Sequence, residues 1–202
     1  MNYLAIDTSG TNLTIVLCID NEKHTYHDKE CGVNHSVALM PKIQSMALEN
    51  NFDLSNVDFF ACVVGAGSFT GIRIAVSTIK AFCFAYKKPC LSITSFDTLA
   101  YNKQGGKNLA VIDAKHNGFY VCGYQDGEVI LPPEYINREQ LNELAKEFNL
   151  VASWQIEGFQ VEEVSVLLGL INAVDKKQNL ITNDLESLIP LYVRKSQAEE
   201  GR

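Results

Sequence analysis

The feature that most constrains the fold is a repeat. The opening "YLAIDTSGTNLTIVLCID" and the later "NLAVIDAKHNGFYVCGYQDGE" both read as an apolar strand ending in aspartate, a polar turn, a second apolar strand and an acidic turn. Asp7 and Asp20 are thirteen residues apart, as are Asp113 and Asp126. Such a duplication predicts two related lobes facing a cleft, with Asp7 and Asp113 at equivalent strand ends. Two unrelated hairpins are the alternative.

The rest of the first half alternates strands with helices. A third short strand, "KHTYHD", is expected after the first hairpin, and a helix is expected over residues 35–50. A strand "FFACVV", a glycine-containing loop, a long helix and a strand "CLSIT" follow. Strands that return through helices imply a mixed sheet with parallel members, and hence an α/β fold. The polar segment "NKQGGKN" is the expected linker, which divides the chain into lobes 1–105 and 106–202.

The second half contains fewer elements. After Pro132 and Pro133, one amphipathic helix is expected over residues 138–148, and a further apolar helix over 161–174. Only the short run "SLIPLYV" precedes a polar tail. We therefore expect a smaller second lobe, with a tail that can pack back on the first.

Composition excludes several classes of protein. The net charge is -7 and no run of Lys and Arg exceeds two residues, whereas a protein that binds nucleic acid unaided usually has a basic stripe. The six cysteines form no CxxC pair, so reduced, structural thiols are expected. The start lacks the pattern of a signal peptide, and no apolar run approaches transmembrane length. We expect a cytoplasmic protein.

Two loops are candidate phosphate-binding elements. The turn after Asp7 could hold Mg²⁺ through its carboxylate and phosphate through backbone N–H groups, although an Asx or Ser/Thr turn needs the same residue types. The loop 65–71 has a strand before it and a helix after it, but it is neither a Walker A loop nor GxGxxG. Ser68 or Thr70 would serve as the helix N-cap. The candidate residues are Asp7, Thr8, Ser9, Gly65, Gly67, Ser68, Thr70, Gly71 and Asp113.

Two helices carry more apolar surface than one sheet can cover. Apolar side chains take up more than half of the circumference of the helix 72–86, and the helix 37–48 is apolar on more than one side. A second protein on top of both helices is one explanation, and coverage by other parts of this chain is the other. The candidate partner residues are Val37, Met40, Ile43, Ala47, Ile72, Ala75, Val76, Ile79, Phe82, Cys83 and Tyr86.

Several blocks, spread over nearly the whole chain, resemble one family. "LAIDTS", "HSVALMP", "GAGSFTGIRIAVSTIKAF", "ITSFDTLA", "VIDAKHNGFYVCGY" and "PLYVRKSQAE" are similar, in this order, to blocks of the TsaB (YeaZ) family of tRNA threonylcarbamoyladenosine biosynthesis. The resemblance implies a two-lobed fold of the actin and sugar-kinase type, a duplicated ribonuclease-H-like unit with a reduced second lobe.

The resemblance also implies a role without chemistry of its own. Such proteins resemble the catalytic paralogue TsaD and pair with it, and the ATPase TsaE joins the assembly. TsaD holds its metal through an HxxxH helix, but this chain has His35 followed by Leu39, so no metal is expected. The glycines of the late nucleotide motif are reduced to Gly158 and Gly169, and Ala66 stands where proline is usual.

We therefore expect this protein to be a non-catalytic activator of a TsaD-like subunit. On its own it should form a homodimer and need no cofactor. It should contact tRNA only through the complex and should not associate with membranes. Weak ATP or ADP binding in the complex is compatible with this expectation. Two alternatives stay open. One is an ATP-dependent transferase or kinase that uses Asp7 and the glycine loop, and the other is a metallopeptidase-like enzyme.

Overall fold

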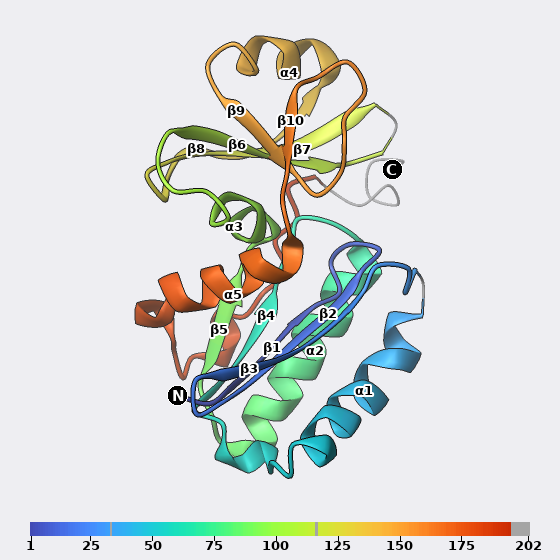
Figure 1. Cartoon of the computed structure of the whole chain (residues 1–202), viewed down its shortest axis with the longest axis vertical. Coiled ribbons are helices and arrows are strands. Elements are labelled where there is room, and N and C mark those ends of the chain that lie inside the picture. The colour runs from blue at the N-terminus through green and yellow to red at the C-terminus, as the bar shows by residue number, and fades with distance from the viewer. Residues whose placement is uncertain (33, 116, 195–202) are drawn as a thin grey trace.

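The first lobe is built on a five-stranded mixed sheet. The computed structural model describes residues 1–32, 34–115 and 117–194, and Figure 1 shows two lobes, one above the other. In the first sheet the strand order is β3-β2-β1-β4-β5, with β1 antiparallel to β2 and parallel to β4. The strands are β1 (Tyr3–Asp7), β2 (Leu13–Ile19), β3 (Glu22–Asp28), β4 (Phe59–Val63) and β5 (Cys90–Ile93).

The second lobe repeats this topology. Its strand order reads β8-β7-β6-β9-β10, with β6 antiparallel to β7 and parallel to β9. Asp7 ends β1 and Asp113 ends β6, so the predicted duplication and the two-lobed α/β fold are confirmed. The strands are β6 (Lys107–Asp113), β7 (Gly118–Gln125), β8 (Glu128–Asn137), β9 (Asn149–Ala152) and β10 (Val161–Glu163).

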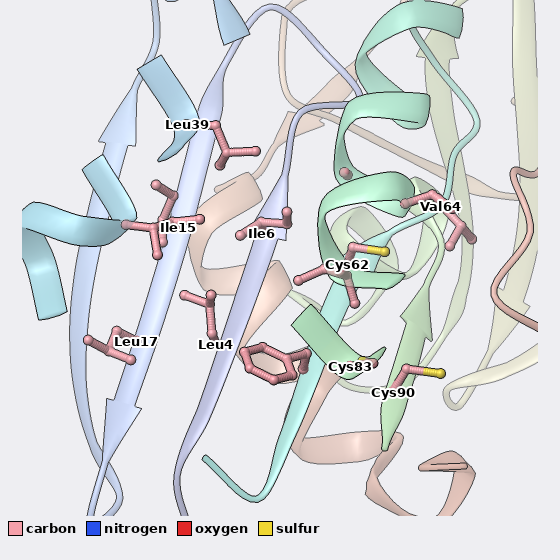
Figure 2. Packing of buried hydrophobic residues seen from close by; sticks show 14 of the residues in the cluster. Leu4, Ile6, Ile15, Leu17, Leu39, Cys62, Val64, Cys83 and Cys90 are labelled. Carbon is pink, nitrogen blue, oxygen red and sulfur yellow. The ribbon is translucent and has the colours of Figure 1, made fainter. Parts of the chain in front are cut away.

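One face of the first sheet is covered by α1 (His35–Glu49) and α2 (Phe69–Tyr86), which lie side by side in Figure 1. Leu39 of α1 and Cys83 of α2 pack with Leu4, Ile6 and the other apolar residues that β1 and β2 turn towards the helices (Figure 2). Burying this apolar surface is the main source of the lobe's stability. In the second lobe, α4 (Arg138–Leu144) covers the outer face of the sheet.

Two further helices are exchanged between the lobes. The helix α3 (Ser95–Ala100) follows β5 of the first lobe but packs against β6, β7 and β9 of the second sheet. The helix α5 (Val166–Lys176) follows β10 of the second lobe but covers the other face of the first sheet through Leu170, Ala173 and Val174. The two helices cross at the junction of the lobes (Figure 1). Each lobe therefore completes the core of the other.

The predicted helix over residues 161–174 was wrong in its first turn. Residues Val161–Glu163 form the strand β10, which pairs in parallel with β9, and the helix starts at Val166. Ser165 caps it by accepting a hydrogen bond from the Leu168 N–H. The helix expected over residues 138–148 ends early, at Leu144. The helix α3 and the strands β8 and β9 were not predicted.

The last described residues form a segment that we call the C-terminal strap, residues 188–194. Leu188 is buried in the first core after two short 3-10 turns, η2 (Gln178–Leu180) and η3 (Leu185–Ser187). A third such turn, η1 (Leu54–Asn56), lies between α1 and β4. The Leu191 N–H then donates to the Val64 carbonyl, and Val193 packs with the second-lobe cluster. Arg194 lies 4.6 Å over the ring of Tyr135 in β8. The strap therefore runs from one lobe to the other.

The helix α2 also meets the length and composition of a membrane span. It has 18 residues and a mean hydropathy of 1.2, so the expectation that no apolar run approaches that length was too strict. In this fold Ile72, Ala75 and Ile79 of α2 are buried against the first sheet, as in the core helix of a globular protein.

Candidate functional site

The turn after β1 is tied together by its own carboxylate. The Asp7 Oδ1 atom accepts hydrogen bonds from the Ser9 N–H at 2.8 Å and from the Ser9 Oγ–H at 2.7 Å. The Ser95 hydroxyl of α3 donates in turn to Ser9 Oγ at 3.0 Å. Burial raises the pKa of Asp7 above the ordinary value, and the hydrogen bonds from Ser9 and the charges of His35 and His27 oppose that rise only in part.

The glycine loop is packed against the chain's own backbone. A Cβ at Gly67 would overlap the Ser9 carbonyl, and one at Gly71 would overlap the Thr8 carbonyl. A Cβ at Gly65 would lie 2.6 Å from the Leu191 carbonyl oxygen of the strap. All three glycines are thus explained by carbonyl groups that belong to this chain.

Hydrogen bonds fix the same packing. The Ser68 N–H donates to the Ser9 carbonyl at 2.6 Å, and the Thr8 hydroxyl donates to the Gly71 carbonyl at 2.7 Å. Ser68 is the N-cap of α2, because its hydroxyl accepts from the Gly71 N–H, while Thr70 is exposed within the first turn. The loop joins two strand ends and starts a helix.

A small cavity lies between the lobes, where the first-lobe turn meets α3 and the second lobe. Its volume is about 100 Å³, below the 300–1,000 Å³ that is usual for ligand pockets. Trp154, which follows β9, lines it from the second lobe and was missed from the sequence, where nothing distinguishes it from a core residue. The cavity is lined by Asp7, Ser9, Gly10, Thr11, Asn12, Ala66, Ser95, Thr98, Leu99, Ile112, Ser153, Trp154 and Val166.

The structure does not bring Asp113 into this cavity. Its carboxylate accepts from the Lys115 N–H at 2.7 Å and pairs with Lys115 Nζ at 2.9 Å. Partial burial acts to raise its pKa, but these contacts with Lys115 outweigh burial and lower it. Asp113 and Asp7 are topologically equivalent but differ in surroundings. His116, in the same turn, lies outside the described residues.

The histidine expected to be a remnant of a metal motif has a structural role here. His35 is buried at the start of α1, and its Nε2 atom lies 3.0 Å from the Asn12 carbonyl. Leu39, one turn later, packs into the first core (Figure 2). Within residues 1–32, 34–115 and 117–194, no three His, Cys, Asp or Glu side chains cluster as metal ligands would.

The predicted partner residues need a correction. Six of them are buried in the core of the first lobe, because α1 and α2 lie side by side on the sheet and pack both against it and against each other; these are Ile43, Ile72, Ala75, Val76, Ile79 and Cys83. Phe82 and Tyr86 are partly buried, with ring centroids 5.3 and 5.8 Å from that of Phe60. Ala47 is half-buried.

Some apolar residues of α1 and α2 do face solvent. Val37 is 73 % exposed and Met40 48 % exposed, as a partner surface requires. Leu48 at 73 % and Phe84 at 82 % are more exposed than most of the predicted set but were not in it. We call Val37, Met40, Leu48 and Phe84 the helical face.

Comparison with known proteins matches this architecture to a family. The family model for TsaD, tRNA N6-adenosine threonylcarbamoyltransferase, matches residues 14–165, which is three quarters of the chain. A Bacillus subtilis protein named tRNA threonylcarbamoyladenosine biosynthesis protein TsaB is 29 % identical over 98 % of this chain and 96 % of its own length. The chain belongs to this family, in its TsaB (YeaZ) group.

Other TsaB relatives are similarly distant in sequence. The TsaB protein of Escherichia coli K12 is 27 % identical over 77 % of this chain and 73 % of its own length. The structure of YeaZ from Pseudomonas aeruginosa superposes with a TM-score of 0.73 at 22 % identity, covering 95 % of this chain and 99 % of that one. That structure supports the fold alone.

The two late glycines of this TsaB-group chain have separate structural explanations. Gly158 has a left-handed backbone, with φ of +81°, in the turn before β10. Gly169 lies where α5 crosses α3, with its Cα against the Thr98 carbonyl. Neither belongs to a shared glycine loop.

Proposed function

We propose that this protein is a non-catalytic subunit for threonylcarbamoyl transfer to the adenosine beside the tRNA anticodon, acting with a TsaD-type transferase and a TsaE-type ATPase. The pathway follows from the function for which its TsaB relatives are named. The absence of chemistry in this chain is our inference from the site.

The packing of the glycine loop carries this proposal. In a loop that binds phosphate, backbone N–H groups are left free to face the ligand. Here Gly67 and Gly71 are pressed against the carbonyls of Ser9 and Thr8, and the Ser68 N–H is already bonded to one of them. Asp113, the equivalent of Asp7, is paired with Lys115. These contacts support a loop with a structural purpose.

The helical face supports a role in assembly. Val37, Met40, Leu48 and Phe84 lie on two neighbouring helices, and burying them in a contact would stabilise it by about 25 cal/mol per Å² of apolar area before the cost of association. We propose that this face binds the TsaD-like subunit, and that a homodimer uses it when the chain is alone. The two partners then compete.

We further propose that no cofactor is required and that the protein works in the cytoplasm. ATP or ADP would bind weakly and only in the complex, where the partner could enlarge the cavity beside Asp7. The chain is acidic overall, so tRNA contacts are expected to come mainly from the other subunits.

A reconstituted modification assay tests these proposals. The TsaD-like and TsaE-like proteins of the same genome, tRNA, ATP and the threonylcarbamoyl donor are combined with and without this chain, and threonylcarbamoyladenosine is quantified. We expect modification to depend on the chain, to survive Asp7→Asn, and to be lost with Val37→Asp combined with Phe84→Asp. Leu168→Asp, on the exposed side of α5, is the matched control and should retain activity.

Two results would contradict the proposal. Full modification without this chain removes the assembly role. Loss of modification with Asp7→Asn, in a variant that still forms the complex, would place chemistry in this subunit and favour the transferase alternative.

A further inference from the structure

A buried carboxylate lies at the junction of the two lobes. The side chain of Asp97 in α3 is 1 % exposed, and its Oδ2 atom is 2.6 Å from Lys177 Nζ. The same oxygen accepts from the Thr94 N–H at 2.7 Å, and Oδ1 accepts from the Tyr124 hydroxyl at 3.0 Å. These three groups all donate to the carboxylate.

Two of these partners come from distant parts of the chain. Tyr124 belongs to β7 of the second sheet, and burial together with the nearby Asp97 charge raises its pKa far above the usual range, so the phenol stays a donor. Lys177 follows the last turn of α5, which covers the first sheet. Asp97 is thus bonded to a residue fixed to each lobe.

Tyr101 strengthens the same junction. Its ring meets that of Tyr124 edge-on at 6.0 Å, and Lys177 Nζ lies 6.0 Å from its centroid. Tyr101 also packs with the cluster between the first sheet and α5, and its hydroxyl donates to the Gly127 carbonyl in the turn after β7. The ion pair is therefore enclosed by groups of both lobes.

A buried ion pair stabilises a junction little, because burying its charges has a large desolvation cost. Removing two charges from water offsets much of their attraction, so an apolar contact would serve stability equally well. A carboxylate that accepts from three donors in fixed directions has a different effect, since it permits only one arrangement of the elements that carry those donors.

The other side of α3 lines the interlobe cavity. Ser95, Thr98 and Leu99 face that cavity, while Asp97 is held by Lys177 and Tyr124. Any separation of the lobes that widened the cavity would move α3 against α5, and would therefore pull Asp97 away from Lys177.

We propose that the Asp97–Lys177–Tyr124 cluster is an interlobe latch, which holds the lobes closed over the cavity and whose release lets them open. This inference does not depend on the proposed function. With the latch closed, the position of the second lobe is fixed relative to α2 and the helical face.

The single tryptophan of the chain provides the measurement. Trp154 lines the cavity from the second lobe, so opening exposes its indole to a small quencher. We compare acrylamide quenching of Trp154 in the full chain with that in Asp97→Asn/Lys177→Met, which removes both charges together and leaves neither buried alone. Lys146→Met, which breaks the surface pair with Glu143 in the second lobe, is the control.

The latch predicts a quenching constant about twofold higher in the double variant, at unchanged far-ultraviolet circular dichroism, and an unchanged constant in Lys146→Met. Tyr124→Phe removes one hydrogen bond without changing charge, and should give an intermediate increase. If the double variant does not fold, the quenching constant of Tyr124→Phe tests the latch instead. Wild-type quenching in a folded variant of the cluster would overturn the proposal.

Discussion

Gly169 of α5 packs directly against the carbonyl oxygen of Thr98 in α3, with no space for a side chain between the two helices. The Asn102 side chain closes the crossing, because its Nδ2 atom donates to the Thr98 carbonyl at 2.8 Å and to the Ser165 carbonyl at 3.1 Å. Both exchanged helices are held at this point, so the crossing is where the two lobes depend on each other most.

The substitution Gly169→Ala should therefore destabilise the protein strongly. Helix propensity alone favours alanine over glycine by about 1 kcal/mol. Overlap of the new Cβ with the Thr98 carbonyl should outweigh that gain and lower the free energy of unfolding by about 3 kcal/mol. Urea denaturation measures the change. Gly10→Ala, where a Cβ would have space, is the control. Equal effects at the two positions would contradict the packing argument.

The glycine loop gives a second stability prediction. Gly71→Ala places a Cβ against the Thr8 carbonyl and should cost about 3 kcal/mol of unfolding free energy. Ser68→Ala removes only the N-cap hydroxyl of α2 and should cost about 1 kcal/mol. Thermal or urea unfolding of the two variants shows which of them loses more stability. If Gly71→Ala were as stable as the wild type, the loop would have room that the structure does not assign to it.

The C-terminal strap should contribute measurably to the first lobe. Leu188→Ala leaves a cavity among residues of the first core, and should lower the free energy of unfolding by about 3 kcal/mol. Its neighbour Ile189 is 63 % exposed, so Ile189→Ala should change stability by less than about 0.5 kcal/mol. A small effect at both positions would mean that the strap is not part of the folded core in solution.

The buried Asp7 should make the protein less stable as pH rises. Burial raises its pKa in the folded state, so the folded state holds the proton more tightly than the unfolded state does. Stability from this group falls as pH rises from the unfolded value through the folded one. We expect Asp7→Asn to raise the unfolding free energy at neutral pH, with a gain that shrinks on acidification.

Asp113 is the control with the opposite sign. Contacts with Lys115 outweigh partial burial and lower its pKa, so its contribution is present above the unfolded value and lost as pH falls through the folded one. Asp113→Asn should therefore slightly destabilise the protein at neutral pH. Urea denaturation at several pH values tests both variants. Destabilisation by Asp7→Asn at neutral pH would show that the Asp7 charge is favourable.

Local patterns in the sequence were sufficient for the strands that open each lobe and for the start of α2. Apolar strands ending in aspartate located β1 and β6, and the hydroxyls before the long helix gave Ser68 or Thr70 as its cap, of which the structure shows Ser68. These features depend on neighbours within a few residues. The repeat then predicted two related lobes with Asp7 and Asp113 at equivalent strand ends, but not the remaining strands of the second sheet.

Contacts between residues that are distant in the sequence could not be predicted from such local patterns. Asp97 and Lys177 are 80 residues apart, and neither lies in a pattern that indicates burial of its charge. The partner surface was misjudged because the arc of α2 includes Ile72 and Ile79, which are buried in the first core, whereas Phe84, which was not in the predicted set, is 82 % exposed. The wide apolar arc of α2 indicated that the helix makes extensive contacts. It could not show whether those contacts are with the first lobe or with a partner protein.

The exchange of α3 and α5 has a consequence during synthesis. When the first ninety-odd residues have left the ribosome, the first sheet is complete, yet the face that α5 will cover is still bare. At about 5–20 residues per second, that face waits several seconds for the residues after Val166. The nascent first half must therefore stay unaggregated on its own or be shielded by a chaperone, and the two halves cannot be expected to fold when made as separate chains.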